Sequence, residues 1–131
     1  MTVVLDSSAL AAVVFGEPGA EAILQTMIRS AGGLAIGAAT RVEIGIVVEA
    51  KQGPQATADL ESLLTRLAVE TVPVDGHQAA EALAAWRRFG KGRHPAALNL
   101  GDCFSYATAR ALGAELLFTG DDFSQTDIAV A

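Results

Sequence analysis

The sequence predicts an α/β fold, a three-layer α/β/α sandwich around a mainly parallel central sheet. Short apolar runs alternate with longer segments of helical character along the 131 residues. Strands that alternate with helices are typical of a parallel sheet covered on both faces. Hydrophobic residues make up 51% of the chain and charged residues 18%, which argues against disorder. A chain of this length is expected to form one domain, residues 1–131.

The first half of the chain contains two predicted strands, each followed by helices. The buried apolar runs 2–5 and 34–36 are the strands. Glycine and proline mark the helix boundaries, and Pro18 suits the first turn of the second helix. The predicted helices span residues 7–14, 18–29, 40–51 and 54–67. In the third of these helices, Val42, Ile46 and Ala50 share one face.

The second half repeats the alternation of strand and helix. Strands are predicted at 69–74 and 115–119, and 128–130 is a candidate for a short last strand. An alanine-rich helix at 77–89 ends at Gly90, and a helix at 99–112 ends at Gly113, because glycine commonly follows the last helical turn.

The bulk properties restrict the compartment and the kind of binding. No apolar run approaches the roughly 20 residues that cross a bilayer, so no membrane association is expected. Cys103 is the single cysteine, which makes a reducing cytoplasm the expected location. The formal net charge of −6 does not favour a domain that coats nucleic acid by bulk charge. An acidic pocket that holds divalent metal remains compatible with that charge.

Five acids fall close to predicted strand ends or in first helical turns. Asp6 follows the first strand, and Asp121 and Asp122 follow the last long strand. Glu43 and Asp102 lie in the first turns of their predicted helices. The carboxyl ends of parallel strands converge on one crevice, so these carboxylates could meet in a single site. Their mutual repulsion would be offset by hard cations, Mg²⁺ or Mn²⁺, which prefer oxygen ligands.

Each acid also has a purely structural interpretation. Asp6 could cap the helix that follows it. Thr40-x-x-Glu43 fits a capping box, and Asn99-x-x-Asp102 imitates one with a shorter acid. The joint pattern favours a metal site, because a cap explains each acid singly but not their common position after strands.

Four stretches of the sequence resemble a known family. "VVLDSSAL", "ATRVEIGIVVEA", "KGRHPAALNLGDCFSYATAR" and "LLFTGDDF" are similar to the PIN-domain ribonucleases, and more narrowly to the VapC toxins of bacterial toxin–antitoxin pairs. The resemblance covers nearly the whole chain in the right order. It implies that Asp6, Glu43 and Asp102 are catalytic metal-binding acids, and that Asp122 is the fourth, with Asp121 at the variable neighbouring place.

The resemblance also implies a function and partners. Ser8 and Thr119 match positions where a small hydroxyl supports the pocket. The family activity is Mg²⁺- or Mn²⁺-dependent cleavage of RNA, with tRNA or rRNA as candidate substrates. A homodimer and a cognate VapB-type antitoxin are the expected partners. A catalytically silent PIN-like protein-binding module is the alternative, whereas a phosphoaspartyl phosphatase would require a second aspartate at the position of Ser8.

A basic stretch, "WRRFGKGRHP", precedes the helix of Asp102. It holds four of the nine basic residues, namely Arg87, Arg88, Lys91 and Arg93. Such a cluster could bind RNA phosphates, and the glycine-rich loop favours this role for Lys91 and Arg93. The alternative is a solvated helix end, where cations interact favourably with the helix dipole.

Overall fold

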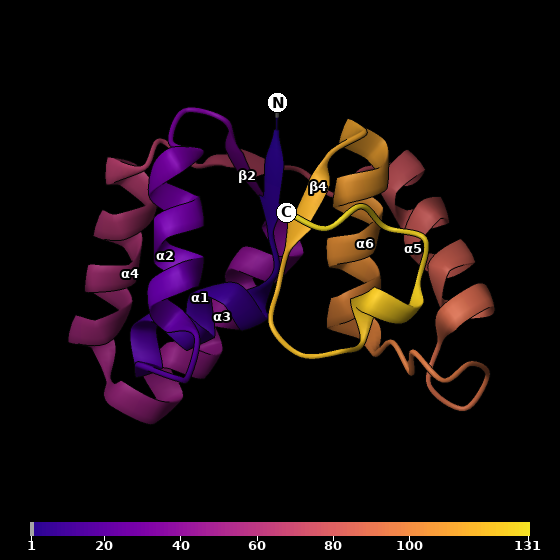
Figure 1. Cartoon of the computed structure of the whole chain (residues 1–131), viewed down its shortest axis with the longest axis horizontal. Helices are drawn as coiled ribbons and strands as arrows, with labels where there is room; N and C mark the ends of the chain where they lie inside the picture. The colour runs from indigo at the N-terminus through magenta and orange to yellow at the C-terminus, as the bar shows by residue number, and fades with distance from the viewer. Residues whose placement is uncertain (1) are drawn as a thin grey trace.

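A computed structural model describes residues 2–131 and contains a four-stranded parallel sheet (Figure 1). The strands are β1 (Val3–Leu5), β2 (Leu34–Gly37), β3 (Glu70–Val72) and β4 (Glu115–Leu117). Their order in the sheet is β3-β2-β1-β4. The chain therefore builds the sheet outward from β1 to β3 and then returns to the other side of β1. This reversal puts a topological switch point, where ligands bind in open α/β sheets, at the carboxyl ends of β1 and β4.

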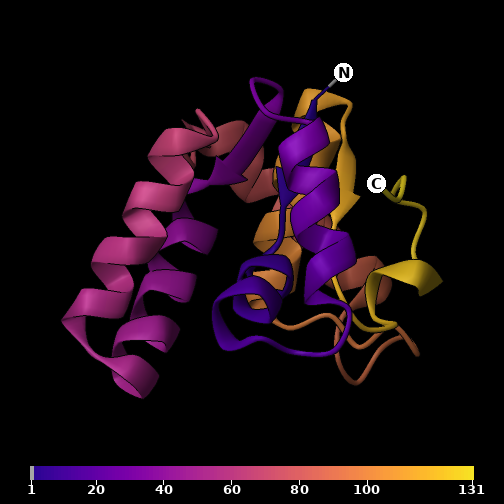
Figure 2. The same cartoon turned by 60° about the vertical axis from the view of Figure 1, so that its left-hand side comes forward.

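Six α-helices cover the two faces of the sheet. They are α1 (Ser7–Phe15), α2 (Ala20–Arg29), α3 (Ala38–Gln52), α4 (Pro54–Arg66), α5 (Gly76–Phe89) and α6 (Leu100–Leu112). The first four helices lie on one side of the sheet, and α5 and α6 lie on the other (Figure 1). From the second viewpoint, α3 and α4 extend side by side away from the rest of the molecule (Figure 2). The predicted three-layer α/β/α sandwich is confirmed.

The side chains of the strands alternate between two hydrophobic cores. Val3 and Leu5 of β1 pack into the core on the side of α1–α4, whereas Val4 packs into the core on the side of α5 and α6. In β4 the same alternation sends Leu117 to the first core and Leu116 to the second. This period of two explains why the strands appear in the sequence as continuous apolar runs, since both faces are buried.

The observed boundaries differ from the predicted ones at the ends of elements. The second helix begins at Ala20 rather than at Pro18, because Gly19, with φ of +88°, forms a left-handed turn before it. The predicted last strand at 128–130 is reduced to one bridge, in which Val130 pairs with Leu116. A short 3₁₀ helix, η1 (Phe123–Gln125), was not predicted.

Helix α3 begins two residues earlier than predicted, and this changes the interpretation of two residues. Glu43 lies in its second turn rather than its first, and Thr40 lies inside the helix, so the two do not form a capping box. The core face of α3 carries Ile44 and Val48, whereas Val42 is 62% exposed. The face that Val42 shares with Ile46 and Ala50 therefore points to solvent.

Within residues 2–131, no helix is both long enough and apolar enough to cross a lipid bilayer.

The C-terminal segment is tied to α6 by a hydrogen bond, and we expect Tyr106→Phe to lower the free energy of unfolding by about 1 kcal/mol. The buried Tyr106 hydroxyl donates to Asp127 Oδ1 at 2.5 Å, which lowers the pKa of Asp127. Urea denaturation would measure the loss. Arg110→Ala is the control, because its guanidinium is 3.9 Å from Asp127 and such exposed pairs contribute little. A larger loss of unfolding free energy in Arg110→Ala than in Tyr106→Phe would contradict this prediction.

Candidate active site

Asp6 is a buried carboxylate at the carboxyl end of β1. Its side chain is the N-cap of α1, since Oδ2 accepts hydrogen bonds from the Ser8 backbone N at 3.0 Å and the Ser8 hydroxyl at 2.6 Å. The residue is only 2% exposed. The predicted capping interpretation is therefore correct, but a cap usually lies at the surface. Polar oxygens buried at this depth need the hydrogen bonds that these donors provide.

A second buried hydroxyl holds the other oxygen of Asp6. Ser105, on α6, donates to Asp6 Oδ1 at 2.5 Å, and its oxygen lies 3.3 Å from the Thr40 hydroxyl on α3. Sequence reasoning singled out neither hydroxyl for this role. The sequence did contain a signal for Ser105. It follows Asp102 by three residues, so the two side chains lie on the same face of the helix.

Ser8 also connects Asp6 to the segment after β4. The backbone N of Thr119 donates to the Ser8 hydroxyl at 3.0 Å. Ser8 thus lies beside the acid, as the resemblance implies, and Thr119 reaches this site through its backbone N–H. The bond joins the two chain segments that flank the switch point of the sheet.

Asp102 lies in the first turn of α6 and interacts electrostatically with three other acids. It forms a reciprocal capping box with Asn99, with bonds of 3.0 and 2.8 Å. The pKa of Asp102 is raised to about 6, mainly by burial. The backbone hydrogen bond from Asn99 opposes this rise, and the charges of Asp6, Asp122 and Glu43 add to it. Three acids from other chain segments therefore lie close enough to act on Asp102.

Of the two adjacent acids after β4, Asp122 is the one whose charge acts on Asp102. The Asp121 backbone carbonyl instead accepts a hydrogen bond from the Ser124 hydroxyl at 2.7 Å. Both residues are exposed. This arrangement favours Asp122 as the fourth acid of the cluster.

Glu43 reaches the cluster from α3. A Cβ placed on Gly101, the residue before Asp102, would lie 2.8 Å from Glu43 Oε1 and 2.9 Å from its Cδ. The Glu43 carboxylate therefore lies against the first turn of α6, although Glu43 is in the second turn of its own helix. The acid cluster is defined here as Asp6, Glu43, Asp102 and Asp122.

The acid cluster has no basic partner among the described residues. The ion pairs in residues 2–131 join Arg41 to Glu61, and Arg88 and Arg110 to Asp127. Carboxylates that have no basic partner, and whose charges raise the pKa of Asp102, are a donor set suited to a hard divalent cation. In the side-chain conformations of this structure, no three acidic, histidine or cysteine side chains of the described chain are arranged to hold one ion together. The fit is therefore one of donor chemistry.

Because the pKa of Asp102 is raised, the metal-free protein is expected to lose stability as the pH rises. Folded Asp102 titrates at about 6 and unfolded aspartate at 3.8, so the folded state binds more protons between these values. The free energy of unfolding should fall from about pH 4 to pH 6. Asp102→Asn should raise the melting temperature at pH 7.5 and change it little at pH 4, in thermal scans with EDTA. Parallel pH profiles of the two proteins would refute this.

The basic stretch lies beside the amino-terminal end of α6. Arg93 packs over the Trp86 ring at 4.5 Å and reaches the Arg87 carbonyl at 3.5 Å. Arg88 pairs with Asp127 at 3.3 Å on the surface. Lys91 lines a mostly apolar cavity of about 510 Å³, whose wall also contains Trp86 and Asn99. Since Asn99 is hydrogen-bonded to Asp102, this loop adjoins the acid cluster.

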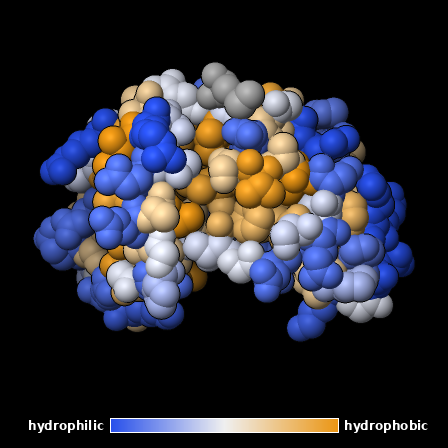
Figure 3. Space-filling view, viewed as in Figure 1, coloured by the Kyte–Doolittle hydropathy of each residue, from blue (hydrophilic) through white to orange (hydrophobic). Residues whose placement is uncertain are grey.

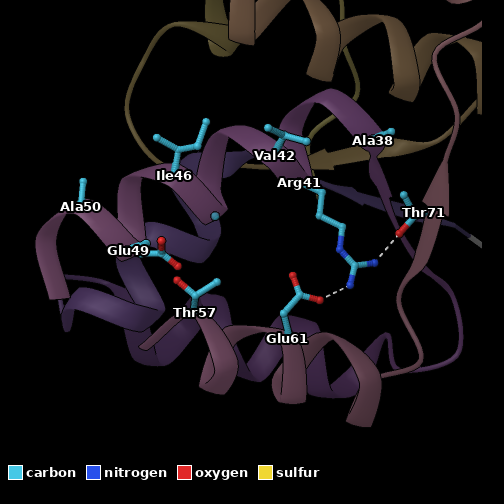
Figure 4. A pocket seen from close by; sticks show the side chains of 10 residues that line it. Ala38, Arg41, Val42, Ile46, Glu49, Ala50, Thr57, Glu61 and Thr71 are labelled. Carbon is cyan, nitrogen blue, oxygen red and sulfur yellow. Dashed lines mark hydrogen bonds and ion pairs between the residues drawn. The ribbon is translucent and has the colours of Figure 1, made fainter. Parts of the chain in front are cut away.

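A larger cavity, of about 990 Å³, lies between α3 and α4 and does not include the acid cluster. Figure 4 shows Arg41 on its wall, bonded to Glu61 and to the Thr71 hydroxyl, while Val42 and Ile46 line the α3 side. The wall carries an internally neutralised ion pair and no cluster of acids. Its composition suits apolar contact with a partner better than metal chemistry.

The surface is hollowed at the edge of the sheet where the strands end. Figure 3 shows this hollow between the half that carries α2 and α4 and the half that carries α5 and α6. The carboxyl end of β1, which Asp6 follows directly, points to this edge (Figure 1). A hollow at a switch point is the usual place for a ligand in this class of fold.

Comparison with solved structures shows the same fold. The crystal structure of Mycobacterium tuberculosis VapC20, described as a sarcin-ricin loop cleaving toxin, superposes with a TM-score of 0.81, at 15% identity, over 99% of this chain and 98% of that one. The DNA-bound VapBC complex of Salmonella typhimurium superposes with a TM-score of 0.80, at 16% identity, over 100% of this chain and 97% of that one.

Sequence comparison gives closer relatives. The chain is 44% identical over 126 residues to "Ribonuclease VapC" of Mycolicibacterium smegmatis, covering 96% of this chain and 97% of that protein. It is also 44% identical to Ribonuclease VapC30 of Mycobacterium tuberculosis, over 96% of this chain and 95% of the relative. Residues 3–129 match the family model of the PIN domain. The chain therefore belongs to the PIN-domain family, among the VapC proteins.

Proposed function

We propose that this protein is a metal-dependent endoribonuclease that hydrolyses RNA phosphodiester bonds and acts as the toxin of a type II toxin–antitoxin pair. The observation that carries the proposal is the acid cluster, whose charges act together on Asp102 without a basic partner in residues 2–131. The 44% identity to proteins named ribonucleases gives the reaction class.

The proposed cofactor is Mg²⁺ or Mn²⁺. Asp6 and Asp102 would hold it directly with Asp122, and Glu43 would share it or orient the attacking water. A divalent ion held by these acids would supply an activated water and would stabilise the leaving oxygen of a phosphodiester.

The remaining residues hold these acids in position. Ser8 and Ser105 fix both oxygens of Asp6, so that its remaining lone pairs keep one direction. Asn99 orients the turn that carries Asp102. These contacts support pre-organisation, which lowers the entropic cost of bringing substrate and acids together.

The proposed partners are a cognate VapB-type antitoxin and a second copy of the chain, in the cytoplasm. Exposed apolar side chains support a protein partner, since Val42 and Ile46 on α3 are 62% and 64% exposed. They lie on the same helix as Glu43. A partner that covers this face would therefore lie beside the acid cluster.

The direct test is RNA cleavage by antitoxin-free protein in Mg²⁺ or Mn²⁺, with tRNA and rRNA as substrates. Cleavage that stops when EDTA is added and returns when Mn²⁺ is restored would support the proposal. Cleavage that persists in EDTA would contradict it. Mn²⁺ binding without cleavage of any RNA would favour the silent protein-binding module.

We expect the double substitution of Lys91 and Arg93 by alanine to weaken RNA binding and its salt dependence. Each lost phosphate contact should lower the slope of log affinity against log salt by about 0.7 for single-stranded RNA. Fluorescence anisotropy with labelled RNA, in EDTA to prevent cleavage, would measure both quantities.

The matched control for this pair is the double substitution of Arg29 and Arg66 by alanine. These basic residues lie in the last turns of α2 and α4, away from the acid cluster. The control should leave the salt slope almost unchanged. Equal losses in the two double variants would show that binding follows net charge and not the loop.

A further inference from the structure

The glycine before Asp102 has no conformational explanation. Gly101 lies in the first turn of α6, and its φ is not in the positive range that favours glycine. Glycine inside a helix is unfavourable relative to alanine, because it loses more backbone entropy on folding. A glycine here therefore requires another reason, and the surroundings of its Cα provide one.

The space beside Gly101 is filled by the Glu43 carboxylate. A Cβ at residue 101 would meet Glu43 Oε1 at 2.8 Å and Cδ at 2.9 Å, and Oε2 would be closer still. Real Cβ atoms essentially never come within 3.0 Å of such neighbours. Any side chain at this position would consequently displace Glu43.

The displaced group would be the flexible end of Glu43 and not the backbone. A substitution at Gly101 should therefore move the carboxylate away from Asp102 at little cost to folding. A second glycine also lies against α6, since a Cβ on Gly37, the last residue of β2, would lie 2.6 Å from the Thr108 hydroxyl. Helices α3 and α6 are in contact, and Gly101 directly precedes Asp102 in the first turn of α6.

We propose that Gly101 is a positioning residue, whose missing side chain admits the Glu43 carboxylate to the acid cluster beside Asp102. The expected effect of Gly101 on metal binding and RNA cleavage rests on the proposed function. The steric relation between Gly101 and Glu43 is independent of that function.

The test compares Gly101→Ala, Glu43→Asp and the double variant. Gly101→Ala should weaken Mn²⁺ binding about tenfold or more, the scale reported for residues that orient metal ligands. Calorimetry without RNA measures this affinity. Because aspartate is one methylene shorter, it withdraws the carboxylate from the new methyl group. The double variant should therefore bind Mn²⁺ more tightly than the product of the two single losses predicts.

Gly45→Ala is the matched control. Gly45 lies in α3, and a Cβ there meets nothing within 4 Å. This change should raise the melting temperature slightly and leave Mn²⁺ affinity unchanged. A second readout, independent of metal, is the ¹³C chemical shift of the Glu43 carboxyl group, which should move in Gly101→Ala and not in Gly45→Ala.

The outcomes separate the two proposals. Wild-type protein that neither binds Mn²⁺ nor cleaves RNA would overturn the proposed function, and the Glu43 chemical shift would still decide the role of Gly101. Unchanged Mn²⁺ affinity and an unchanged Glu43 shift in Gly101→Ala would overturn the positioning role. If Gly101→Ala folds only when Glu43→Asp is also present, the steric clash lies between these two residues, which would support the inference.

Discussion

Asp102→Asn is expected to reduce the rate of RNA cleavage by about 10³-fold, the scale of losing one group that acts directly on the transition state. The fold should survive, because the asparagine side-chain oxygen can still accept the hydrogen bond that Asn99 donates to Asp102. The loss should therefore appear in the rate of cleavage and not in thermal stability, which should increase at pH 7.5. Single-turnover cleavage assays and thermal scans on one preparation would measure both.

The two adjacent acids after β4 provide an internal control for this prediction. Asp122 contributes to the raised pKa of Asp102, and Asp121 does not contribute. Asp122→Asn should accordingly reduce cleavage strongly, whereas Asp121→Asn should change it by less than about threefold, the effect of a surface charge. Full activity of a clean Asp102→Asn preparation would remove the acid cluster from the mechanism. Equal losses at 121 and 122 would mean that the doublet acts through its total charge.

The fold could be predicted because its main signals are local. The apolar run that becomes β1 and the glycines after α5 and α6 mark their elements without reference to the rest of the chain. The start of α3 could not be placed, because no side chain caps it and Gly37 is the residue before it. The single bridge between Val130 and Leu116 depends on the path of the segment after β4 back to the sheet. The local hydrophobic pattern does not specify that path.

The acids of the site could be selected from the sequence, whereas the residues that hold them could not. Asp6 follows a strand and Asp102 opens a helix, and both positions can be located from periodicity. The roles of Ser105 and Gly101 depend on how closely α6 approaches β1 and α3. That approach joins residues 99 positions apart in the case of Ser105 and Asp6. A small residue in a helix has many possible explanations until its neighbour is known.

The exposed face of α3 is another feature that could be predicted only in part from the sequence. A period of four marked Val42 and Ile46 as one apolar face, and apolar faces of helices usually pack into a core. Here the core face is the one that carries Ile44 and Val48, and the exposed face borders the cavity between α3 and α4. The sequence pattern identifies which residues share a face, but the partner of that face is a tertiary property.

The buried hydroxyl of Ser105 leads to the second large expected effect. Ser105→Ala should reduce cleavage by about 10- to 100-fold, the range found when the partner of a metal ligand is removed. It should also lower the free energy of unfolding by about 1–3 kcal/mol, because Asp6 Oδ1 would lose its donor in a buried position. Activity assays at saturating Mn²⁺ and urea denaturation would separate the two effects.

Ser8→Ala tests whether these effects arise from the oxygen that loses its donor. Asp6 Oδ2 accepts from both the hydroxyl and the backbone N of Ser8, so it keeps one donor when the hydroxyl is removed. Asp6 Oδ1 has only the Ser105 hydroxyl among its hydrogen bonds in the described chain. Cleavage should therefore fall less in Ser8→Ala than in Ser105→Ala, and Ser62→Ala, an exposed serine of α4, should have no effect. The reverse order would mean that the bond from Thr119 to Ser8, and not the orientation of Asp6, limits the activity of the site.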